Sequence, residues 1–450
     1  MIVPRDRLIF GAAVVLVPGA LVLAVSPAHV VTVLCGWLAF LLLLAIDATL
    51  APGRLAGIRA AFPDTVRMTK EREGVIPVHL ANERACARTL RLGLSLPRAI
   101  ASPEESQLTR LPQGVPEVRL DWPCTPHKRG RFPINRVYIS MASPLGFWDF
   151  RKVLEGRTEL RVYPNLQGER RRLAAIFLNR GNLGIHAQRR LGKGRDFEQL
   201  REYIPGDSFE DIHWKATARR ARPVTKVYQI ERTQEIYVAI DASRLSARTA
   251  PDDAEGVPGG GLTSQLERFI TAALVLGMVA EKQGDLFGLL TFSDRVHGFV
   301  RARNGKAHYN VCRETLYSLE TQPVNPDFEE LFSFVRQRLR RRALLIILTN
   351  LDDPVLAQHF TRNLDVVTRR HLVLVNMITP PGVRPLFSRD GVKTPDDIYR
   401  HLAGHLRWHD LRELQRALQR RGVPLSLLDN AALTPELVSQ YVNVKQRQVL

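Results

Sequence analysis

A dense group of charged and aromatic residues occupies residues 192–219, which read GKGRDFEQLREYIPGDSFEDIHWKATAR. At its centre, Pro205-Gly206-Asp207 predicts a tight turn, because proline fixes one backbone dihedral and glycine permits a positive one. His213, with Asp211 and Asp207 nearby, has the residue types of an acid–base pair, but the stretch has no obvious serine or cysteine nucleophile. We therefore interpret it as a rigid polar segment that joins two domains, either as a docking face or as a structural joint alone.

A second candidate site follows the apolar segment 236–240, where Asp241 and Ser243 place a carboxylate and a hydroxyl two residues apart. Hard oxygen ligands of this kind suit Mg²⁺ better than softer metals. Further polar residues follow another apolar segment, ALLIIL, and are Thr349, Asn350 and Asp352. If both apolar segments are strands of one parallel sheet, the two groups lie at the same edge of that sheet.

The elements that would position this second site alternate along residues 235–450. Apolar, β-branched segments are predicted as strands at residues 235–240, 286–292, 296–301, 343–348, 371–378 and 423–429. Helices are predicted at residues 262–282, 307–319, 328–341, 354–370, 395–420 and 434–444. This alternation is typical of a doubly wound α/β sheet, in which ligands bind at the carboxyl ends of the strands.

Residues 60–168 have a different period. Short, partly alternating segments bounded by Pro, Gly or Asn lie at residues 75–82, 89–97, 117–122, 131–140 and 158–164. Such segments are typical of half-buried strands, and with no convincing helix between them they predict a small β-sandwich. No nucleophile, acid pair or metal-ligand group stands out here, so we expect a spacer or an interaction module.

Two uncharged apolar segments, residues 8–25 and 30–46, precede this region. Each would span about 26 Å as a helix, which is enough to cross a bilayer with interfacial flanks. A cleaved signal peptide is the alternative, because Arg5 and Arg7 form a positive leader, but a second apolar segment follows at once, which favours a transmembrane hairpin. Lys and Arg flank both ends of the hairpin and are absent from its turn, which predicts that both ends are cytoplasmic. Asp47 is interpreted as a helix-end residue at the interface.

The charge and cysteine content limit the classes of partner and cofactor that we expect. The net charge is +19, but only ten of the 64 basic residues are Lys, and the arginines are spread along the chain. A nucleic-acid-binding face needs clustered charge, so we expect no nucleic-acid partner. The four cysteines (Cys35, Cys86, Cys124 and Cys312) form no CxxC pair, which argues against a disulfide scaffold and a zinc site.

The central stretch resembles the family known as domain of unknown function 58. That family's pattern is approximately G-x-G-x-[ED]-[FY], then L-R-x-Y-x-P-G-D, then I-[DH]-W-[KR]-x-[ST]-A-R. We assign an interaction or structural role to the matching residues Arg201, Tyr203, Pro205, Gly206, Asp207, Trp214, Lys215 and Arg219. The resemblance embraces nearly the whole chain, which we divide into a transmembrane hairpin (1–52), a β-sandwich-like domain (60–168), a signature segment and linker (169–234) and an α/β domain (235–450).

The α/β region is similar to a von Willebrand factor A domain. The metal-ion-dependent adhesion site of such domains uses Asp-x-Ser-x-Ser after the first strand, a Thr from a second loop and an Asp from a third. Asp241 and Ser243 match the first two positions, Leu245 replaces the second Ser, and Asn350 stands where the third-loop Asp would fall. Residues 304–308 contain no clear Thr. The resemblance implies a degenerate site at which Mg²⁺ is possible, and we expect no other cofactor.

Members of the domain of unknown function 58 family are bacterial, membrane-anchored and without known enzymatic activity, and their genes often accompany MoxR-type AAA ATPases. The resemblance therefore implies a non-enzymatic adaptor or scaffold. It would act with such an ATPase on client proteins, in their assembly or maturation or in the cell envelope. It also implies a multi-pass protein of the inner membrane with a cytoplasmic soluble region. The alternative is a hydrolase or a nucleotide-responsive enzyme centred on residues 192–219.

Overall fold

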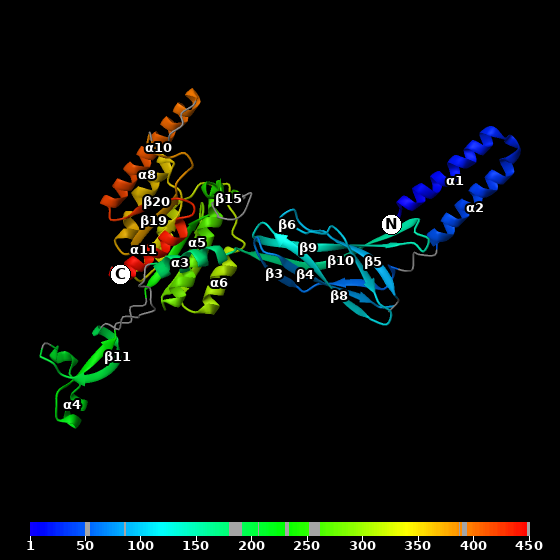
Figure 1. Ribbon diagram of the computed structural model, residues 1–450. Helices are drawn as coiled ribbons and strands as arrows, with labels where there is room; N and C mark the ends of the chain where they lie inside the picture. The colour runs from blue at the N-terminus through cyan, green and yellow to red at the C-terminus, as the bar shows by residue number, and fades with distance from the viewer. Residues whose placement is uncertain are drawn as a thin grey trace. The chain divides into compact units, whose positions relative to one another are not determined.

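The computed structural model describes residues 1–49, 55–84, 87–179, 191–205, 207–229, 234–251, 262–386, 388 and 394–447 (Figure 1). The chain divides into two compact units, Met1–Asn165 and Leu166–Leu450. The first unit contains two apolar helices and two β-sheets, and the second contains a six-stranded α/β sheet.

The two apolar helices begin the first unit. They are α1 (Asp6–Val25) and α2 (Val30–Thr49). Trp37 Nε1 donates a hydrogen bond to the carbonyl of Val15 at 3.3 Å, and a Cβ on Gly19 would lie 2.6 Å from the same nitrogen, so glycine lets the helices approach. Both helices are long and apolar enough to cross a membrane, and α1 buries none of its side chains. The prediction of two apolar N-terminal helices is confirmed.

Two sheets form the rest of the first unit. Their strands are β1 (Ile2–Pro4), β2 (Ile58–Ala61), β3 (Thr65–Thr69), β4 (Gly74–Asn82), β5 (Arg88–Leu94), β6 (Ile100–Ala101), β7 (Gln107–Leu111), β8 (Glu117–Pro126), β9 (Gly130–Ala142) and β10 (Trp148–Tyr163). One sheet has the order β1-β10-β9-β5-β7, with β3 also paired to β10, and the other has the order β2-β4-β8-β6. Alternate residues of β4, namely Ile76, Val78 and Leu80, are fully buried, as in a half-exposed strand. They join side chains from both sheets in one hydrophobic core, which is the arrangement of a sandwich.

Several strands of this unit are not visible in the sequence pattern. The strands β2, β3, β6 and β7 have at most five residues each, too few to display a period. The sequence predicts only the last part of β10, because a register shift between Glu155 and Thr158 breaks the alternation. Backbone pairing with β9 on one side and with β1 and β3 on the other holds β10 instead.

A buried carboxylate, that of Asp47 near the end of α2, joins the helices to the sheets. Its Oδ2 accepts hydrogen bonds from Ser143 Oγ at 2.6 Å and from Phe147 N at 3.4 Å. Its Oδ1 accepts from Leu145 N at 3.0 Å. Nearby, Trp148 Nε1 donates to a backbone carbonyl of α2 at 3.1 Å. The sequence predicts only a helix-end residue here, whereas the structure shows that Asp47 organises the turn between β9 and β10.

The second unit is built on a sheet of order β17-β16-β13-β18-β19-β20, parallel throughout except for the edge strand β17. The strands are β13 (Glu235–Asp241), β16 (Leu286–Phe292), β17 (Val296–Arg303), β18 (Leu344–Leu348), β19 (Leu372–Ile378) and β20 (Leu425–Leu428). The helices are α5 (Gln265–Lys282), α6 (Lys306–Leu316), α7 (Phe328–Arg338), α8 (Pro354–Asn363), α9 (Asp365–Thr368), α10 (Pro395–Arg420) and α11 (Leu433–Arg447). A small hairpin of β14 (Thr249–Pro251) and β15 (Leu262–Ser264) precedes α5. The predicted doubly wound sheet is therefore present, with α8 and α9 in place of one predicted helix.

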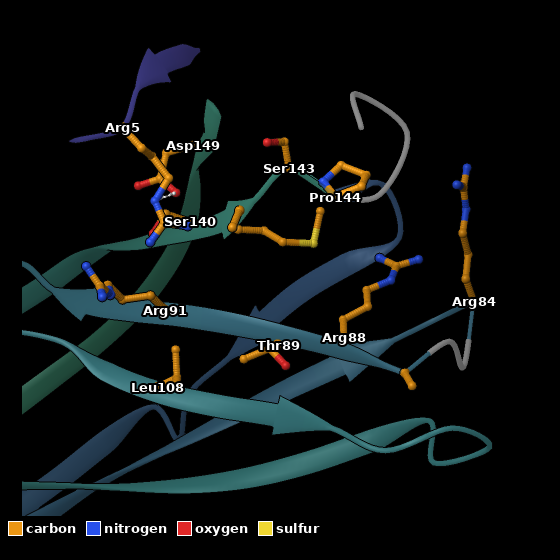
Figure 2. A pocket seen from close by; sticks show the side chains of 13 residues that line it. Arg5, Arg84, Arg88, Thr89, Arg91, Leu108, Ser140, Ser143, Pro144 and Asp149 are labelled. Atoms are coloured by element: carbon orange, nitrogen blue, oxygen red, sulfur yellow. Dashed lines mark ion pairs between the residues drawn. The ribbon is translucent and has the colours of Figure 1, made fainter. Parts of the chain in front are cut away.

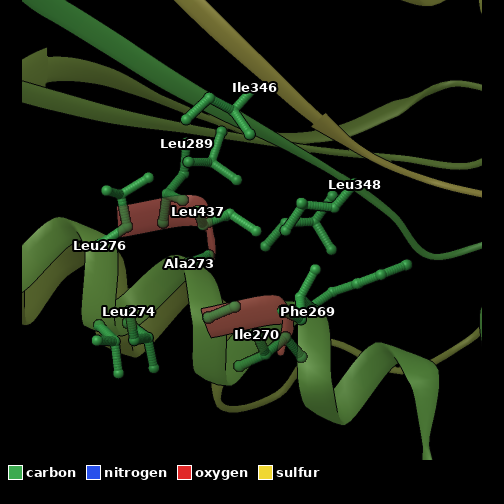
Figure 3. Packing of buried hydrophobic residues seen from close by; sticks show 14 of the residues in the cluster. Phe269, Ile270, Ala273, Leu274, Leu276, Leu289, Ile346, Leu348 and Leu437 are labelled. Atoms are coloured by element: carbon green, nitrogen blue, oxygen red, sulfur yellow. The ribbon is translucent and has the colours of Figure 1, made fainter. Parts of the chain in front are cut away.

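The central strand β13 serves two hydrophobic cores. Ile236, Val238 and Ile240 point into one core with α5, α6 and α11, while Tyr237 and Ala239 point into the other with α7 to α10. Figure 3 shows the first core, where side chains of α5 and α11 pack against those of the strands. Because successive residues face opposite sides, a strand covered by helices on both faces must be apolar throughout.

The arginine-rich stretch after the first unit begins with a helix that the sequence does not predict, α3 (Gln167–Asn179). Leu173 of α3 belongs to the first core of the α/β sheet, and Glu169 pairs with Arg268 of α5 at 3.5 Å. The arginines at the start of α3 hide this packing in the sequence.

The signature segment is a separate small structure. It consists of β11 (Leu191–Glu202), α4 (Trp214–Arg220) and β12 (Val224–Gln229), with a 3-10 turn at Phe209–Asp211. The strands β11 and β12 pair antiparallel, and α4 lies in the connection between them.

We expect Asp47→Ala to lower the free energy of unfolding of the first unit by about 2–4 kcal/mol. The substitution leaves the Ser143 hydroxyl and two amide N–H groups without their acceptor at a fully buried position. Thermal unfolding of the full chain in detergent, with hydrogen exchange of residues 143–148, measures the effect. The matched control is Asp121→Ala, because Asp121 is about half exposed and pairs with Arg119 on the surface, so its loss should cost less than about 0.5 kcal/mol. Equal stability of the two variants would contradict the assignment.

Candidate functional site

The signature segment is closed by the carboxylate of Asp207. Its Oδ1 accepts a hydrogen bond from Arg201 Nη2 at 2.6 Å. Its Oδ2 accepts from Ile204 N at 3.1 Å and from Thr225 Oγ1 at 3.4 Å. The amide of Ile204, together with the Arg201 guanidinium, holds the pKa of Asp207 below its usual value. The Asp207 side chain thus holds the turn predicted from the sequence, whose Gly206 lies outside the described residues.

The groups that acid–base chemistry would need are used to hold α4. His213 is the N-cap of α4, and its Nδ1 accepts a hydrogen bond from Ala216 N at 3.0 Å. Thr217 Oγ1 accepts from Val224 N at 3.1 Å. Within the described part of the chain, no hydrogen bond joins His213 to Asp207. The structure therefore does not assemble the acid–base pair that the sequence suggests.

The same segment exposes large apolar side chains. Ile204 is 56% exposed, Phe209 is 74% exposed and Trp214 is 70% exposed. The ring of Tyr203 stacks on Phe209 with 6.0 Å between the centroids. We call Ile204, Phe209 and Trp214 the exposed apolar face. The other exposed residues of the sequence signature are Pro205, Lys215 and Arg219.

The sequence identifies only part of this face. It singles out Trp214 through the family pattern, but not Ile204 or Phe209. The usable signal is that these two apolar residues stand in a polar stretch with no strand or helix period that would bury them.

The second candidate site lies at the carboxyl ends of β13 and β18, where the strand pattern places it. Thr349 Oγ1 donates a hydrogen bond to Asp241 Oδ2 at 2.6 Å, and Ser243 N donates to Asp241 Oδ1 at 2.8 Å. Ser243 Oγ in turn accepts from Leu245 N at 3.4 Å. All four residues are buried, and this burial raises the pKa of Asp241.

The neighbouring residues of the β18 loop have other partners. Asn350 Nδ2 donates to Gln265 Oε1, and Arg248 Nη1 donates to Asp352 Oδ2 at 2.5 Å. Gln265 N also donates to the carbonyl of Arg248 at 2.9 Å. Asp353 caps the N-terminus of α8. These contacts tie the β18 loop to the start of α5.

A different loop from the one expected covers this edge. The resemblance to a von Willebrand factor A domain predicts a threonine from a second loop, near the start of α6. Instead, Gln322 N donates to the carbonyl of Ala242 at 2.7 Å, and Arg244 N donates to the carbonyl of Val324 at 3.0 Å. The loop between α6 and α7, which contains Thr321, therefore lies here. No motif marks this loop, so only the backbone pairing reveals it.

We propose that this edge is stable without a divalent cation. Both oxygens of Asp241 already accept hydrogen bonds from the protein, and the buried Leu245 supplies no ligand. The Arg248 guanidinium adds a positive charge beside Asp352. The Oδ1 atoms of Asn350 and Asp352 are buried without a hydrogen-bond partner in the described part, but they do not replace the missing ligands.

No group of three or more His, Cys, Asp or Glu residues suited to a metal occurs among the described residues. His401 and His405 are spaced i, i+4 on α10, and His405 Nδ1 accepts a hydrogen bond from Leu386 N at 3.1 Å.

We propose that Asp241 and Ser243 order the loop after β13.

Asp241→Asn should change how the stability of the α/β sheet depends on pH. Burial raises the folded pKa of Asp241, so its stabilisation is fully present below the unfolded pKa of about 4 and is lost as the pH rises through the folded pKa. The variant cannot ionise, so its stability relative to the wild type should increase with pH over that window. The measurement is a denaturant titration at several pH values. The unfolded fraction of the α/β sheet is then determined by labelling peptides of β13 at one fixed pH. A difference that stays constant with pH would contradict the proposed role of burial.

Mg²⁺ should leave the thermal unfolding of the α/β sheet unchanged, because the protein itself satisfies the carboxylate that a cation would need. Melting temperatures in EDTA and in millimolar Mg²⁺ are compared for the wild type and for Asp241→Ala. A ligand that binds only the folded state raises the melting temperature with its concentration. Such a rise in the wild type, absent from the variant, would show that a cation does bind.

Comparisons with known proteins find one family model and several solved structures similar to parts of this chain. A family model described as "Protein of unknown function DUF58" matches residues 199–383. None of the curated proteins matches the chain. One similar structure is an aerotolerance-related membrane protein from Bacteroides fragilis NCTC 9343, at 14% identity and TM-score 0.29, covering 47% of this chain and 98% of that one. Another is the conserved hypothetical protein BatB from Bacteroides thetaiotaomicron, at 12% identity and TM-score 0.28, covering 48% and 99%. A third is the SpRpn10 VWA domain, at 9% identity and TM-score 0.26, covering 46% and 95%.

Proposed function

We propose that this chain is a membrane-anchored, non-enzymatic adaptor that binds partner proteins through its signature segment and its α/β domain. The observation that carries this proposal is that, in the signature segment, polar side chains hold the backbone while apolar side chains are exposed. Asp207 and Arg201 hold the turn, while the exposed apolar face remains in solvent. Aromatic side chains, Trp above all, are enriched at the energetic centres of protein interfaces.

The partner class follows from the family resemblance and from charge. The resemblance implies a MoxR-type AAA ATPase, which would deliver or remodel client proteins in assembly, maturation or the cell envelope. Lys215 and Arg219 are exposed on α4 beside Trp214, so the face suits a partner surface that combines an apolar pocket with acidic residues.

We propose that residues 235–450 form a von Willebrand factor A-like domain. Support comes from the doubly wound sheet with one antiparallel edge strand and from Asp241 and Ser243 at the carboxyl end of β13. In this chain the hydrogen-bonded edge around Asp241 would act as a preformed protein-binding surface without a cation.

Membrane anchoring by α1 and α2 completes the proposal. The hydrogen bonds of Asp47 attach the helix pair to the β-sheets, so the anchor and the first unit move together. The basic residues at both ends of the pair support a soluble region on the cytoplasmic side of the inner membrane.

The alternative, a hydrolase centred on residues 192–219, requires a nucleophile and a base that are available to substrate. His213 and Thr217 both accept hydrogen bonds from backbone amides that hold α4. This use of the two side chains favours an adaptor over a catalytic centre.

Trp214→Ala should reduce capture of the ATPase about tenfold or more, because loss of a central interface aromatic costs about 2 kcal/mol. The full chain is purified from detergent-solubilised membranes, and co-purifying proteins are quantified by mass spectrometry. The matched control is Tyr399→Ala on α10, because Tyr399 is also an aromatic residue with 70% exposure.

Two results would overturn the proposal. One is the absence of any MoxR-type ATPase from the wild-type sample. The other is a Trp214→Ala variant that captures partners as the wild type does but loses turnover of a hydrolysable substrate, which would support the enzyme alternative.

A further inference from the structure

A cavity of about 730 Å³ lies in the first unit, and Figure 2 shows the side chains that line it. Arg5, which immediately precedes α1, lines it at one side. Ser143 and Pro144 line it at another, and they belong to the turn whose hydroxyl and amides bind Asp47 of α2. The cavity therefore adjoins the ends of both helices, at the depth where lipid headgroups meet a membrane-spanning pair.

The lining of this cavity carries a strong positive charge. It contains four arginines, Arg5, Arg84, Arg88 and Arg91, and a single carboxylate, Asp149, so its formal charge is 4 − 1 = +3. Arg5 Nε lies 3.5 Å from Asp149 Oδ1, which uses up the one negative group. A cluster of this kind attracts anions.

One of these arginines is held in place by the fold. Arg88 is only 9% exposed, and its Nη1 donates a hydrogen bond to the carbonyl of Ala56 at 3.2 Å. A buried guanidinium costs free energy unless its charge is matched, and among the described residues this one is hydrogen-bonded to a neutral carbonyl. Such a group stabilises a bound anion more than a solvated surface arginine would, because its position is fixed before binding.

The remaining lining combines hydroxyl and apolar groups. Thr89, Ser140 and Ser143 supply hydroxyls, whereas Leu108 and Met141 supply apolar surface, and Leu108 is 72% exposed. A free inorganic anion would gain nothing from the apolar side chains. A phospholipid offers both kinds of contact, with a phosphate and polar groups in the head and hydrocarbon close by.

We propose that this cavity binds the phosphate of an anionic phospholipid headgroup. Bidentate pairing of arginine with phosphate oxygens supplies the recognition, and the position beside α1 and α2 supplies the source of the ligand. The inference rests on the membrane anchoring proposed above. The bound lipid would fix the β-sheets against the membrane surface.

The test uses the full chain in nanodiscs of phosphatidylcholine with increasing phosphatidylglycerol, and native mass spectrometry counts the retained lipids. Arg88→Gln/Arg91→Gln removes two cavity charges. At about fivefold per arginine, phosphatidylglycerol retention should weaken about 30-fold. The matched control is Arg136→Gln/Arg157→Gln, which removes two exposed arginines from β9 and β10 outside the cavity lining. The control should retain phosphatidylglycerol as the wild type does.

A second variant protects the test against misfolding. Arg91 is exposed, so Arg91→Gln alone should keep the thermal stability of the wild type and still weaken retention about fivefold. Unchanged retention in both cavity variants, or an equal loss in the Arg136/Arg157 control, would overturn the proposal.

Competition experiments distinguish a lipid phosphate from a soluble phosphate compound as the ligand of the cavity. Inorganic phosphate and glycerol phosphate are added as competitors, and neither should displace phosphatidylglycerol at millimolar concentration. Displacement by either would assign the cavity to a soluble phosphate compound and overturn the lipid proposal. Failure of the chain to enter nanodiscs at all would contradict the membrane anchoring, whereas entry without preference for phosphatidylglycerol would contradict only the lipid site.

Discussion

The buried carboxylate of Asp47 is the interaction on which the first unit depends. A charge near the end of an apolar helix is costly unless it is satisfied, and here a hydroxyl and two amides of one turn satisfy it. The need for these donors fixes the turn from Ser143 to Phe147 against α2. That contact also places the start of β10 beside β1 and Arg5, because β1 pairs with the first residues of β10. The arginine-lined cavity is therefore a consequence of how the helix pair is attached.

Asp207 also holds a turn through its carboxylate, in the signature segment. It also accepts hydrogen bonds from a backbone amide and a side-chain donor to close a turn, but it does so near solvent. Since the turn is held by polar groups, no apolar side chain is needed inside it. Phe209 and Trp214 are exposed on the surface. Both carboxylates show how a dense polar motif can hold backbone in place rather than perform chemistry.

The sequence predicts the α/β sheet and the helix pair well, because strands such as Ile236–Ile240 are buried on both faces and read as continuous apolar runs. It predicts the β-sheets of the first unit less well, because β10 is held by pairing with three neighbours and carries a register shift. For the candidate sites, strand ends correctly bring Asp241 and Thr349 together. The loop containing Thr321 and the partners of Asp47 depend on contacts between residues distant in sequence, which no local pattern records.

Three buried carboxylates join elements of the fold. Asp47, Asp241 and Asp285 are each less than 2% exposed. Asp285 accepts hydrogen bonds from Tyr441 Oη, from Lys445 Nζ at 2.7 Å and from Gln234 N at 3.2 Å. Like the other two, it is committed to joining elements of the fold. A general acid or base must keep at least one atom available to substrate. Carboxylates that hold elements together in this way suit the protein-binding scaffold proposed above, because preorganised surface lowers the cost of binding.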